Sequence, residues 1–246
     1  MSQHRLADTA DRLLAARRTG ARIAPADAEL PADYAQGFAI QERVVAGLNS
    51  PVIGWKVMQV PEGPVIFAPL LQAGQVAAGG RWTVTGTEPA GIELEIAFRI
   101  GADVPSRASG AELLASVAAA HVAFELCQSR IANPEARPRH VMLADCIANA
   151  GLVVGSEIDA FRTRDLTGRP GRLLVDGAVH AEGRSGDPLA VLQLLPPALA
   201  AQGKALEAGQ IVITGSLIGM NWLHGRHDLL GRIDGCGEVA MTLIAA

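Results

Sequence analysis

The sequence predicts an α+β fold, in which a helical segment over residues 1–50 precedes a β-rich body over residues 51–246. In the first 50 residues the apolar side chains recur at helical spacing, whereas period-2 alternation dominates from Pro51 onward. A chain of 246 residues with 27 Gly and 14 Pro suits one large domain built of short elements and tight turns. No internal repeat or low-complexity linker interrupts the β-rich body. The one expected boundary therefore lies near residue 50.

Two helices are expected in the first segment. The first carries Ala10, Leu13 and Leu14 at helical spacing, with Asp8 or Thr9 as its cap. The second runs over residues 31–48 and ends at Asn49-Ser50-Pro51, because the residue before a proline disfavours helix. Its expected buried stripe comprises Phe38, Gln41, Val44, Val45 and Leu48.

Strand-like patterns begin immediately after Pro51. Residues 52–57 are typical of a buried strand, Gly63-Pro64 marks a loop, and short segments follow around Gln75 and Trp82. The clearest strand covers residues 92–100, because its side chains alternate strictly between two faces. One face carries Ile92, Leu94, Ile96, Phe98 and Ile100, and the other carries Glu93, Glu95, Ala97 and Arg99.

The second half of the chain mixes turn, helix and strand signals. Ser109 and Glu112 form a capping-box signature for a short helix. Asp176-Gly177 is typical of a hairpin turn within residues 173–180. Asp187-Pro188 opens a further helix, which Pro196-Pro197 is expected to kink. The remaining expected strands cover residues 119–127, 152–154, 211–213 and 239–244.

Composition narrows the classes of protein. A net charge of −4 gives no basic footprint for nucleic acid. Three Cys without a Cys-x-x-Cys pair indicate neither a disulfide framework nor a structural zinc site, and they are expected to be packing residues. The charged first 20 residues lack the apolar core of a signal peptide, and no apolar run is long enough to span a bilayer. We therefore expect a cytoplasmic protein without a membrane or nucleic-acid partner.

Three glutamates are the first candidates for a functional site. Glu93 and Glu95 share one face of a strand, with Cα atoms about 6.5–7 Å apart, so both carboxylates can reach one small cation. Taken alone, such a pair far more often belongs to an ordinary solvated strand face. Glu125 lies in a strand that is apolar on both faces, and a buried Glu is rare unless it is paired or metal-bound. A salt bridge from Glu125 to Arg130 or to another base remains an equal alternative.

Four further residues are candidates, each with a structural alternative. Lys56 follows Gly54-Trp55 in a buried strand, where it can hold a carboxylate, act as an acid–base with a lowered pKa, or reach out to water. Arg130 suits a carboxylate fork but is also a common surface residue. Asp145 is either an orienting residue or a turn residue. Ser216, in Thr214-Gly215-Ser216, offers anion-binding groups or merely a turn, and the histidines, His121 included, form no convincing ligand set.

In the order and spacing of these residues the chain resembles the 2-keto-4-pentenoate hydratases, a branch of the fumarylacetoacetate hydrolase superfamily. The resemblance covers most of the chain. Its motifs are Ala39-Ile40-Gln41, Gly54-Trp55-Lys56, Glu93-Leu94-Glu95 with Ala97-Phe98, Phe124-Glu125-Leu126 with Ser129-Arg130, Ala144-Asp145, and Ile213-Thr214-Gly215-Ser216-Leu217. It implies a β-rich mixed-sheet roll over residues 51–246 that carries the catalytic site, and a homo-oligomer.

The resemblance also implies the chemistry. Glu93, Glu95 and Glu125 would bind Mg²⁺ or Mn²⁺, Lys56 and Asp145 would be catalytic, and Arg130 and Ser216 would contact a small 2-oxo acid substrate. The expected activity is a metal-dependent hydro-lyase of aromatic catabolism, which adds water to a 2-hydroxy-2,4-dienoate. The alternatives are decarboxylation of a 2-oxo-3-hexenedioate, which needs a second cation for the distal carboxylate, C–C hydrolysis of an acylpyruvate, and a binder without turnover.

The chain departs from the family pattern at three places. Cys146 stands where an Asn often follows the aspartate, residues 58–67 differ from the usual loop of small polar residues, and residues 221–227 replace an expected Gly-Asp turn. These regions are expected to shape the substrate pocket, so the departures bear on the identity of the substrate more than on metal binding.

Overall fold

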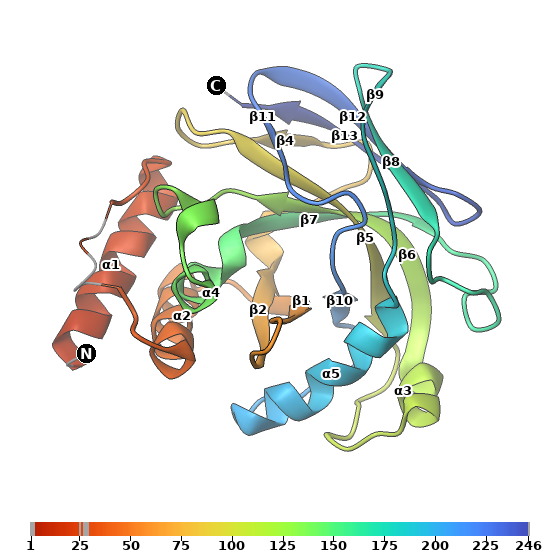
Figure 1. Ribbon diagram of the computed structural model, residues 1–246, viewed down its shortest axis with the longest axis horizontal. Coiled ribbons are helices and arrows are strands. Elements are labelled where there is room, and N and C mark those ends of the chain that lie inside the picture. Colours follow the sequence, from red (N-terminus) through yellow and green to blue (C-terminus); the bar gives the residue numbers. More distant parts are fainter. Residues whose placement is uncertain (1–2, 25, 27–29, 246) are drawn as a thin grey trace.

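Two curled β-sheets form the body of the protein, with helices packed against one end and one side (Figure 1). The structure is a computed structural model that describes residues 3–24, 26 and 30–245. Its larger sheet has eight strands in the order β2-β1-β10-β5-β6-β7-β3, with β11 paired to β5, and its smaller sheet has the order β4-β13-β12-β8-β9. Helices together with mixed sheets confirm the predicted α+β class.

Both sheets are built mainly from antiparallel pairs, but β1 and β10 run parallel in the larger sheet. The strands of the larger sheet are β1 (Val52–Gln59), β2 (Val65–Leu71), β3 (Gln75–Val76), β5 (Ala90–Ile100), β6 (Val117–Cys127), β7 (Asn149–Glu157), β10 (Ile211–Ile213) and β11 (Asn221–Leu223). Those of the smaller sheet are β4 (Arg81–Thr83), β8 (Pro170–Val175), β9 (Ala178–Arg184), β12 (Arg226–Ile233) and β13 (Gly237–Ile244).

The helices gather in two places. Helices α1 (Gln3–Thr19), α2 (Tyr34–Leu48) and α4 (Arg139–Ala144) lie together at one end, and α3 (Gly110–Ser116) and α5 (Pro188–Ala201) lie below the sheets in Figure 1. Short 3₁₀ turns cover η2 (Gln72–Gly74), η3 (Pro134–Ala136) and η4 (Cys146–Ala148). The part of the chain that the structure describes contains no helix with the length and apolarity needed to cross a membrane.

Local signals in the sequence explain several of these elements. Ser109 and Glu112 form the expected capping box of α3, and Asp187 caps α5 through the amide of Ala190. Asp176 and Gly177 adopt φ of 50° and 84°, the left-handed pair that a tight hairpin turn requires. The expected cap of the first helix at Asp8 or Thr9 is wrong, because α1 begins earlier and the Thr9 hydroxyl donates within it to the carbonyl of Arg5.

The main core lies between the two sheets, where β12 crosses closely over β5 and β6. A Cβ at Gly231 would lie 2.6 Å from side-chain atoms of Leu94 and Phe124, so only glycine permits this approach. A second core joins α1, α2 and α4 to β2 through buried residues such as Leu13, Ile40 and Ile66. The first core includes residues of β1, β5 and β6, whereas the second fixes the helices against β2.

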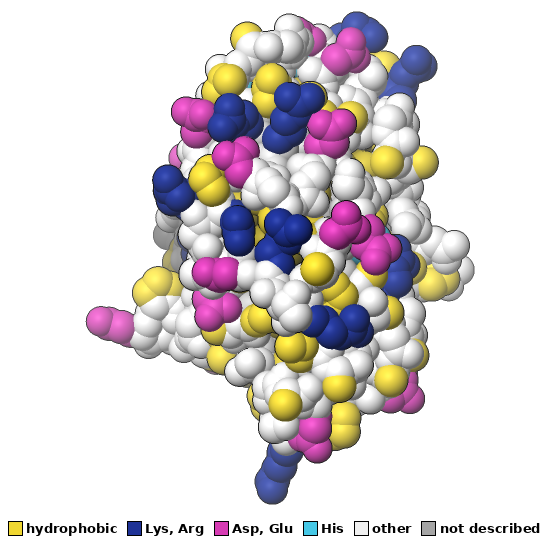
Figure 2. All heavy atoms as spheres, turned by 90° about the vertical axis from the view of Figure 1, so that its right-hand side faces the viewer, with side chains coloured by type: hydrophobic (Ala, Val, Ile, Leu, Met, Phe, Trp, Pro, Cys, Tyr) yellow, Lys and Arg dark blue, Asp and Glu magenta, His cyan; other side chains and the backbone are white. Residues whose placement is uncertain are grey.

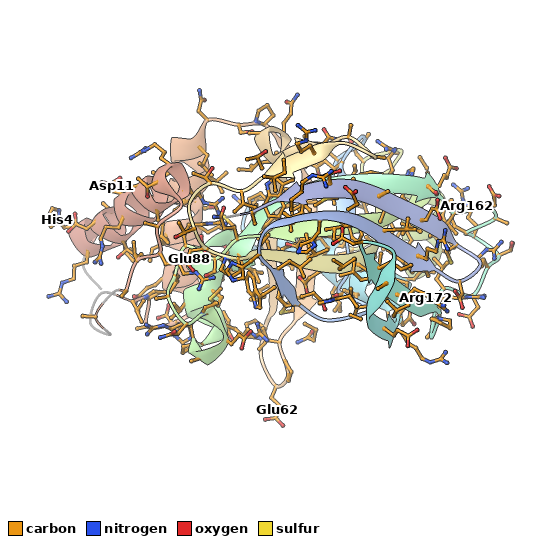
Figure 3. The ribbon with its side chains drawn as sticks, turned by 90° about the horizontal axis from the view of Figure 1, so that it is seen from above. His4, Asp11, Glu62, Glu88, Arg162 and Arg172 are labelled. Atoms are coloured by element: carbon orange, nitrogen blue, oxygen red, sulfur yellow. The ribbon has the colours of Figure 1, made fainter. Side chains whose placement is uncertain are left out.

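Three strands were absent from the sequence-based prediction. Residues 58–67 do not form a loop, because Met58 and Gln59 end β1 and β2 begins at Val65. The connection is a tight turn with Glu62 at φ 53°, and Figure 3 shows this side chain at the tip of the hairpin, pointing away from the body. Residues 221–227 likewise form β11 and the start of β12, and β11 pairs antiparallel with β5.

Candidate active site

The paired strands β5 and β6 bring the predicted glutamates together. Glu93 and Glu125 stand directly opposite each other, so their side chains share one face of the sheet. Two residues along, Glu95 opposes Ala123 on the same face, and in the other direction Cys127 opposes Gly91. The central pair of carboxylates is thus flanked by a carboxylate on one side and a thiol on the other.

Lys56 enters this face from β1. Its Nζ donates to Oε1 of Glu125 at 2.6 Å and to the carbonyl of Ile147 at 3.2 Å, and its exposure is only 5%. The expected reach of this side chain to water is therefore wrong. The base that pairs with Glu125 is Lys56 and not Arg130. Oε1 of Glu125 also accepts 2.8 Å from Nδ2 of Asn149, a contact that no sequence pattern signalled.

The pKa of Lys56 is shifted in the direction opposite to one sequence-based alternative, that of an acid–base with a lowered pKa. Burial by itself lowers its pKa, but the carboxylates of Glu125 and Glu93 outweigh burial and raise the pKa above its ordinary value. A lowered pKa for Lys56 is therefore wrong, and the amine is a cation in this site.

The positive groups around the three carboxylates do not balance their negative charge. Burial and then the charge of Glu125 raise the pKa of Glu93 to about 7, and burial with the charges of Glu125 and Glu93 raises the pKa of Glu95 well above its usual range. Oε2 of Glu125 is fully buried without a hydrogen-bond partner. One oxygen each of Glu93 and Glu125 and the Cys127 sulfur lie within 4.8 Å of one another. An orphaned buried oxygen in a ring of anionic donors fits a divalent cation.

Two cavities open onto these groups. The first, about 250 Å³, is lined by Lys56, Glu93, Glu95 and residues 213–216, so it contains Ser216. The backbone amide of Gly215 donates 2.7 Å to Oε2 of Glu95 and fixes this carboxylate at the cavity wall. The second cavity, about 380 Å³, shares Lys56, Met58 and Glu93 with the first. Its other walls include Glu135, Arg139, Met142, Ile147, Met220 and Trp222.

Strained backbone supports the buried end of the site. Cys146, Ile147 and Ala148 have φ of 53°, 52° and 62°, a left-handed turn that L-residues rarely adopt. This turn directs the Ile147 carbonyl to Lys56 and leads into Asn149, which contacts Glu125. The strain is located where the backbone supplies a carbonyl to Lys56 and places the Asn149 side chain against Glu125.

Arg130 and Asp145 form a separate buried pair. Oδ1 of Asp145 accepts 2.7 Å from Nε of Arg130, Oδ2 accepts 2.8 Å from the Arg130 amide, and Arg17 approaches the carboxylate at 3.6 Å. Burial and the nearby Arg17 lower the pKa of Arg130 to about 10. Neither Arg130 nor Asp145 is among the residues that line the two cavities. The structure therefore brings Lys56 together with Glu93, Glu95, Glu125 and Ser216, and sets Arg130 and Asp145 on the far side of the left-handed turn.

Other neighbours of the site were missed or interpreted differently. Met58 and Trp222 lie in two segments whose patterns departed from the family, and Arg139 lies in a third segment for which nothing was predicted. Cys127, expected to be a packing residue, contacts Oε2 of Glu93 through Sγ at 3.8 Å. His121 is buried, and its Nδ1 lies 3.4 Å from the carbonyl of Gly155.

No family model matches the sequence. Two proteins named 2-keto-4-pentenoate hydratase are similar over nearly the whole chain. The protein from Burkholderia vietnamiensis is 29% identical over 258 residues, which cover 96% of this chain and 97% of that protein. The protein from Paraburkholderia phymatum is 28% identical over 256 residues, 96% of each chain.

Solved structures share the fold. The 4-oxalocrotonate decarboxylase from Pseudomonas putida G7, complexed with magnesium and adipate, superposes with a TM-score of 0.87 at 19% identity over 99% of both chains. The fumarylpyruvate hydrolase from Pseudomonas aeruginosa, in complex with Mn²⁺ and pyruvate, gives a TM-score of 0.60 at 17% identity over 80% of this chain and 91% of that one. The chain is thus similar over nearly its whole length to two proteins named 2-keto-4-pentenoate hydratase, and it has a fold of the fumarylacetoacetate hydrolase type.

Proposed function

We propose that the protein is a divalent-metal-dependent hydro-lyase that adds water to a 2-hydroxy-2,4-dienoate and releases a 4-hydroxy-2-oxo acid. The observation that carries the proposal is the group of Glu93, Glu95, Glu125 and Lys56. Lys56 and Glu93 line two adjoining cavities, Glu95 lines one of them, and Lys56 pairs with the buried Glu125. The full-length similarity to named 2-keto-4-pentenoate hydratases supports the reaction class. The Mg²⁺, Ca²⁺ or Mn²⁺ bound by structures of the same fold supports the use of a divalent ion.

We assign Glu93, Glu95 and Glu125 as the metal ligands. The ion in this proposal is Mg²⁺ or Mn²⁺, because carboxylate oxygens suit hard cations. When bound, the ion supplies Lewis-acid stabilisation of the negative charge that develops on the 2-oxo group and the carboxylate of the substrate. Gly215 holds Glu95 in its orientation through the 2.7 Å hydrogen bond. Asn149 does the same for Glu125 at 2.8 Å.

The reaction adds protons at two carbons, C5 and C3, and oxygen at a third, C4. Ketonisation removes the proton of the 2-hydroxyl group and adds one at C5. Conjugate addition then joins the oxygen of water to C4 and a proton to C3, so the product gains one water molecule. Lys56 lines both cavities as a cation, and we assign it to hold the substrate carboxylate during ketonisation. Ser216 lies at the wall of the first cavity, where its hydroxyl can orient a substrate oxygen or the added water.

Asp145 and Arg130 act through other residues in this proposal. Their buried pair packs against the turn that presents Ile147 and Asn149, and Arg130 donates 2.8 Å to the carbonyl of Asn149. We therefore assign them to positioning, because neither lines a cavity.

The test uses metal-stripped protein and 2-hydroxypenta-2,4-dienoate, whose ultraviolet absorbance falls as it is consumed. Turnover is expected only after Mg²⁺ or Mn²⁺ is restored. Glu125→Gln is expected to lower kcat/KM by at least about 100-fold, since it removes a ligand at the centre of the site. The matched control is Glu157→Gln, at the far end of β7, which should retain activity. Absence of turnover with either ion would reject the hydratase assignment.

A second activity, decarboxylation of a 2-oxo-3-hexenedioate, is favoured by one residue. Arg139 is an exposed cation in the wall of the second cavity, which Glu93 also lines, and there it can bind a distal carboxylate. The decarboxylase of the same fold was solved with adipate, a six-carbon dicarboxylate. Release of CO₂ from the hexenedioate distinguishes the two activities. If Arg139 binds that carboxylate, Arg139→Leu should raise KM for the dicarboxylate about 10–100-fold and leave KM for the monocarboxylate unchanged. The control Arg107→Leu, on the surface, should change neither KM.

A further inference from the structure

The face of β5 and β6 that carries Glu93 and Glu125 offers different donor atoms at its two ends. The two central carboxylates, Glu93 and Glu125, have an oxygen donor beside them at Glu95 and a sulfur donor beside them at Cys127. Glu95 is turned toward Gly215, whose amide binds its Oε2. The donors that the structure gathers within 4.8 Å of one another are Glu93, Glu125 and Cys127. The face thus offers two overlapping ligand sets of different chemical softness.

The position of Cys127 is defined by its surroundings. It stands opposite Gly91, and a Cβ at Gly91 would lie 2.9 Å from the Cys127 Cβ and 2.4 Å from Sδ of Met220. The absence of a side chain at Gly91 therefore leaves room for both sulfur atoms beside the carboxylates. Cys127 is fully buried, and it packs with Met142 and Ala148. Its sulfur is consequently directed at Glu93, with Sγ 3.8 Å from Oε2.

The distances between these donor atoms suit a single cation bound by all of them. Two donors bound tetrahedrally to Zn²⁺ at ordinary Zn–S and Zn–O lengths lie about 3.5 Å apart, close to the 3.8 Å between Cys127 Sγ and Glu93 Oε2. The buried Oε2 of Glu125 has no partner among the described residues, so one acceptor is free to complete the set. Thiolate sulfur selects soft ions such as Zn²⁺ and Cd²⁺, whereas carboxylates alone favour Mg²⁺ and Mn²⁺.

We propose that this face also binds a thiophilic divalent ion, Zn²⁺ or Cd²⁺, through Sγ of Cys127 together with Glu93 and Glu125, with release of the thiol proton to solvent. This inference rests on the metal site of the proposed function, because both ligand sets use Glu93 and Glu125. Occupation by the soft ion therefore excludes the hard one. The protein would bind Mg²⁺ or Mn²⁺ on the Glu95 side and be inhibited by Zn²⁺ or Cd²⁺ on the Cys127 side.

The test is addition of one equivalent of Cd²⁺ to metal-free protein, with the ultraviolet sulfur-to-cadmium charge-transfer band as the readout. The band is expected in the wild-type protein and in Cys236→Val, the control that removes another buried thiol. It should disappear in Cys127→Val, with Cd²⁺ binding weakened at least about 100-fold by calorimetry and Mn²⁺ binding retained. Binding of Cd²⁺ without the band, or a band that persists in folded Cys127→Val, would overturn the proposal.

A second measurement does not require the Cys127 variant to fold. In Cys146→Ala/Cys236→Val, Cys127 is the one remaining thiol of the three in the chain. The ¹¹³Cd resonance of this protein is expected in the range of sulfur-ligated cadmium, and a resonance in the all-oxygen range would refute the proposal. Neither readout involves substrate. Mg²⁺-dependent turnover without the sulfur signal would reject this inference alone, and the sulfur signal without turnover would reject the hydratase alone.

Discussion

Lys56 and Glu125 form a buried ion pair, 2.6 Å from Nζ to Oε1, at the centre of the carboxylate face. With all three glutamates of this face ionised, the lysine neutralises one of them and leaves a charge of about −2, which matches a divalent cation. The pair therefore fixes both the geometry of Glu125 and the charge that the site presents.

Removal of one partner of this pair should be costly. Lys56→Met is expected to lower the free energy of unfolding by about 3 kcal/mol in chelator, because it leaves a buried carboxylate without its cation. Lys56→Met/Glu125→Gln should recover part of this loss, as urea denaturation will show. The control is Lys204→Met, whose exposed pair with Glu42 is worth less than about 1 kcal/mol. Equal losses in the two lysine variants would contradict a buried pair.

The metal-free protein should lose stability as the pH rises toward neutrality. The pKa of Glu93 is raised to about 7 in the folded protein from 4.5, so the folded state binds the proton more tightly than the unfolded one. This contribution is complete below pH 4.5 and disappears as the pH passes about 7. Thermal denaturation in chelator should show the decline, and Glu93→Gln should flatten it. A saturating divalent ion should reverse it in the wild-type protein, and a pH-independent Tm without metal would argue against crowded carboxylates.

Asp145→Asn should destabilise the protein because it removes the carboxylate that both Arg130 and Arg17 approach. The expected loss is about 3 kcal/mol, the scale of a broken buried pair. Asp159→Asn, on an exposed turn, serves as the control. Denaturant titrations of the two variants measure the difference. If Asp145 acts by positioning, kcat falls in this variant while binding of Mn²⁺ is largely retained; a variant that unfolds no more readily than the control would show that the pair is dispensable.

Glycine should be tolerated at the left-handed turn. Ala148 has φ of 62°, a conformation that costs an L-residue about 1–2 kcal/mol and glycine almost nothing. Ala148→Gly should therefore leave Tm unchanged or raise it, although glycine loses more entropy on folding. In Ala198→Gly, inside α5, the same substitution should cost about 0.5–1 kcal/mol. Differential scanning calorimetry compares them, and a larger loss at Ala148 would mean that the turn is not strained.

His227 should titrate above an ordinary histidine. Its Nδ1 lies 2.6 Å from Asp176, and this hydrogen bond raises the pKa of His227. The pair therefore stabilises the fold below the pKa of the unfolded histidine, and this contribution is lost as the pH rises through the folded value. NMR titration of Asp176→Asn should show the His227 pKa moving down, whereas Asp159→Asn should not move it. An unchanged pKa would show that the bond does not form.

Much of this site could be predicted because strand alternation is a local property. Glu93 and Glu95 fall on one face of a strand by period alone, and the interruption of an apolar strand by Glu125 marked it as partnered. The capping residues of α3 and α5 and the Asp176-Gly177 turn are equally local. What the sequence could not decide was which base meets which acid, since Lys56 and Arg130 were both available and only the register of β1, β6 and β7 separates them.

The missed parts depend on tertiary context. β2 lacks clean alternation, because it is buried on both faces over most of its length and its neighbours set its conformation. The left-handed turn at residues 146–148 has no glycine or asparagine to signal it until Asn149. Figure 2 shows that lysine and arginine side chains are interspersed with acidic ones on the face at the right of Figure 1. The net charge of the chain does not reveal this pattern.

Gly54 is a residue without chemistry of its own, and it governs how far this pocket can be redesigned. A Cβ at this position would lie 1.9 Å from the carbonyl oxygen of Ile211 on β10, so any other residue would push β1 outward and carry Lys56 with it. Libraries aimed at new substrates should therefore vary Met58, Arg139 and Trp222, which only line the cavity, and leave Gly54 untouched.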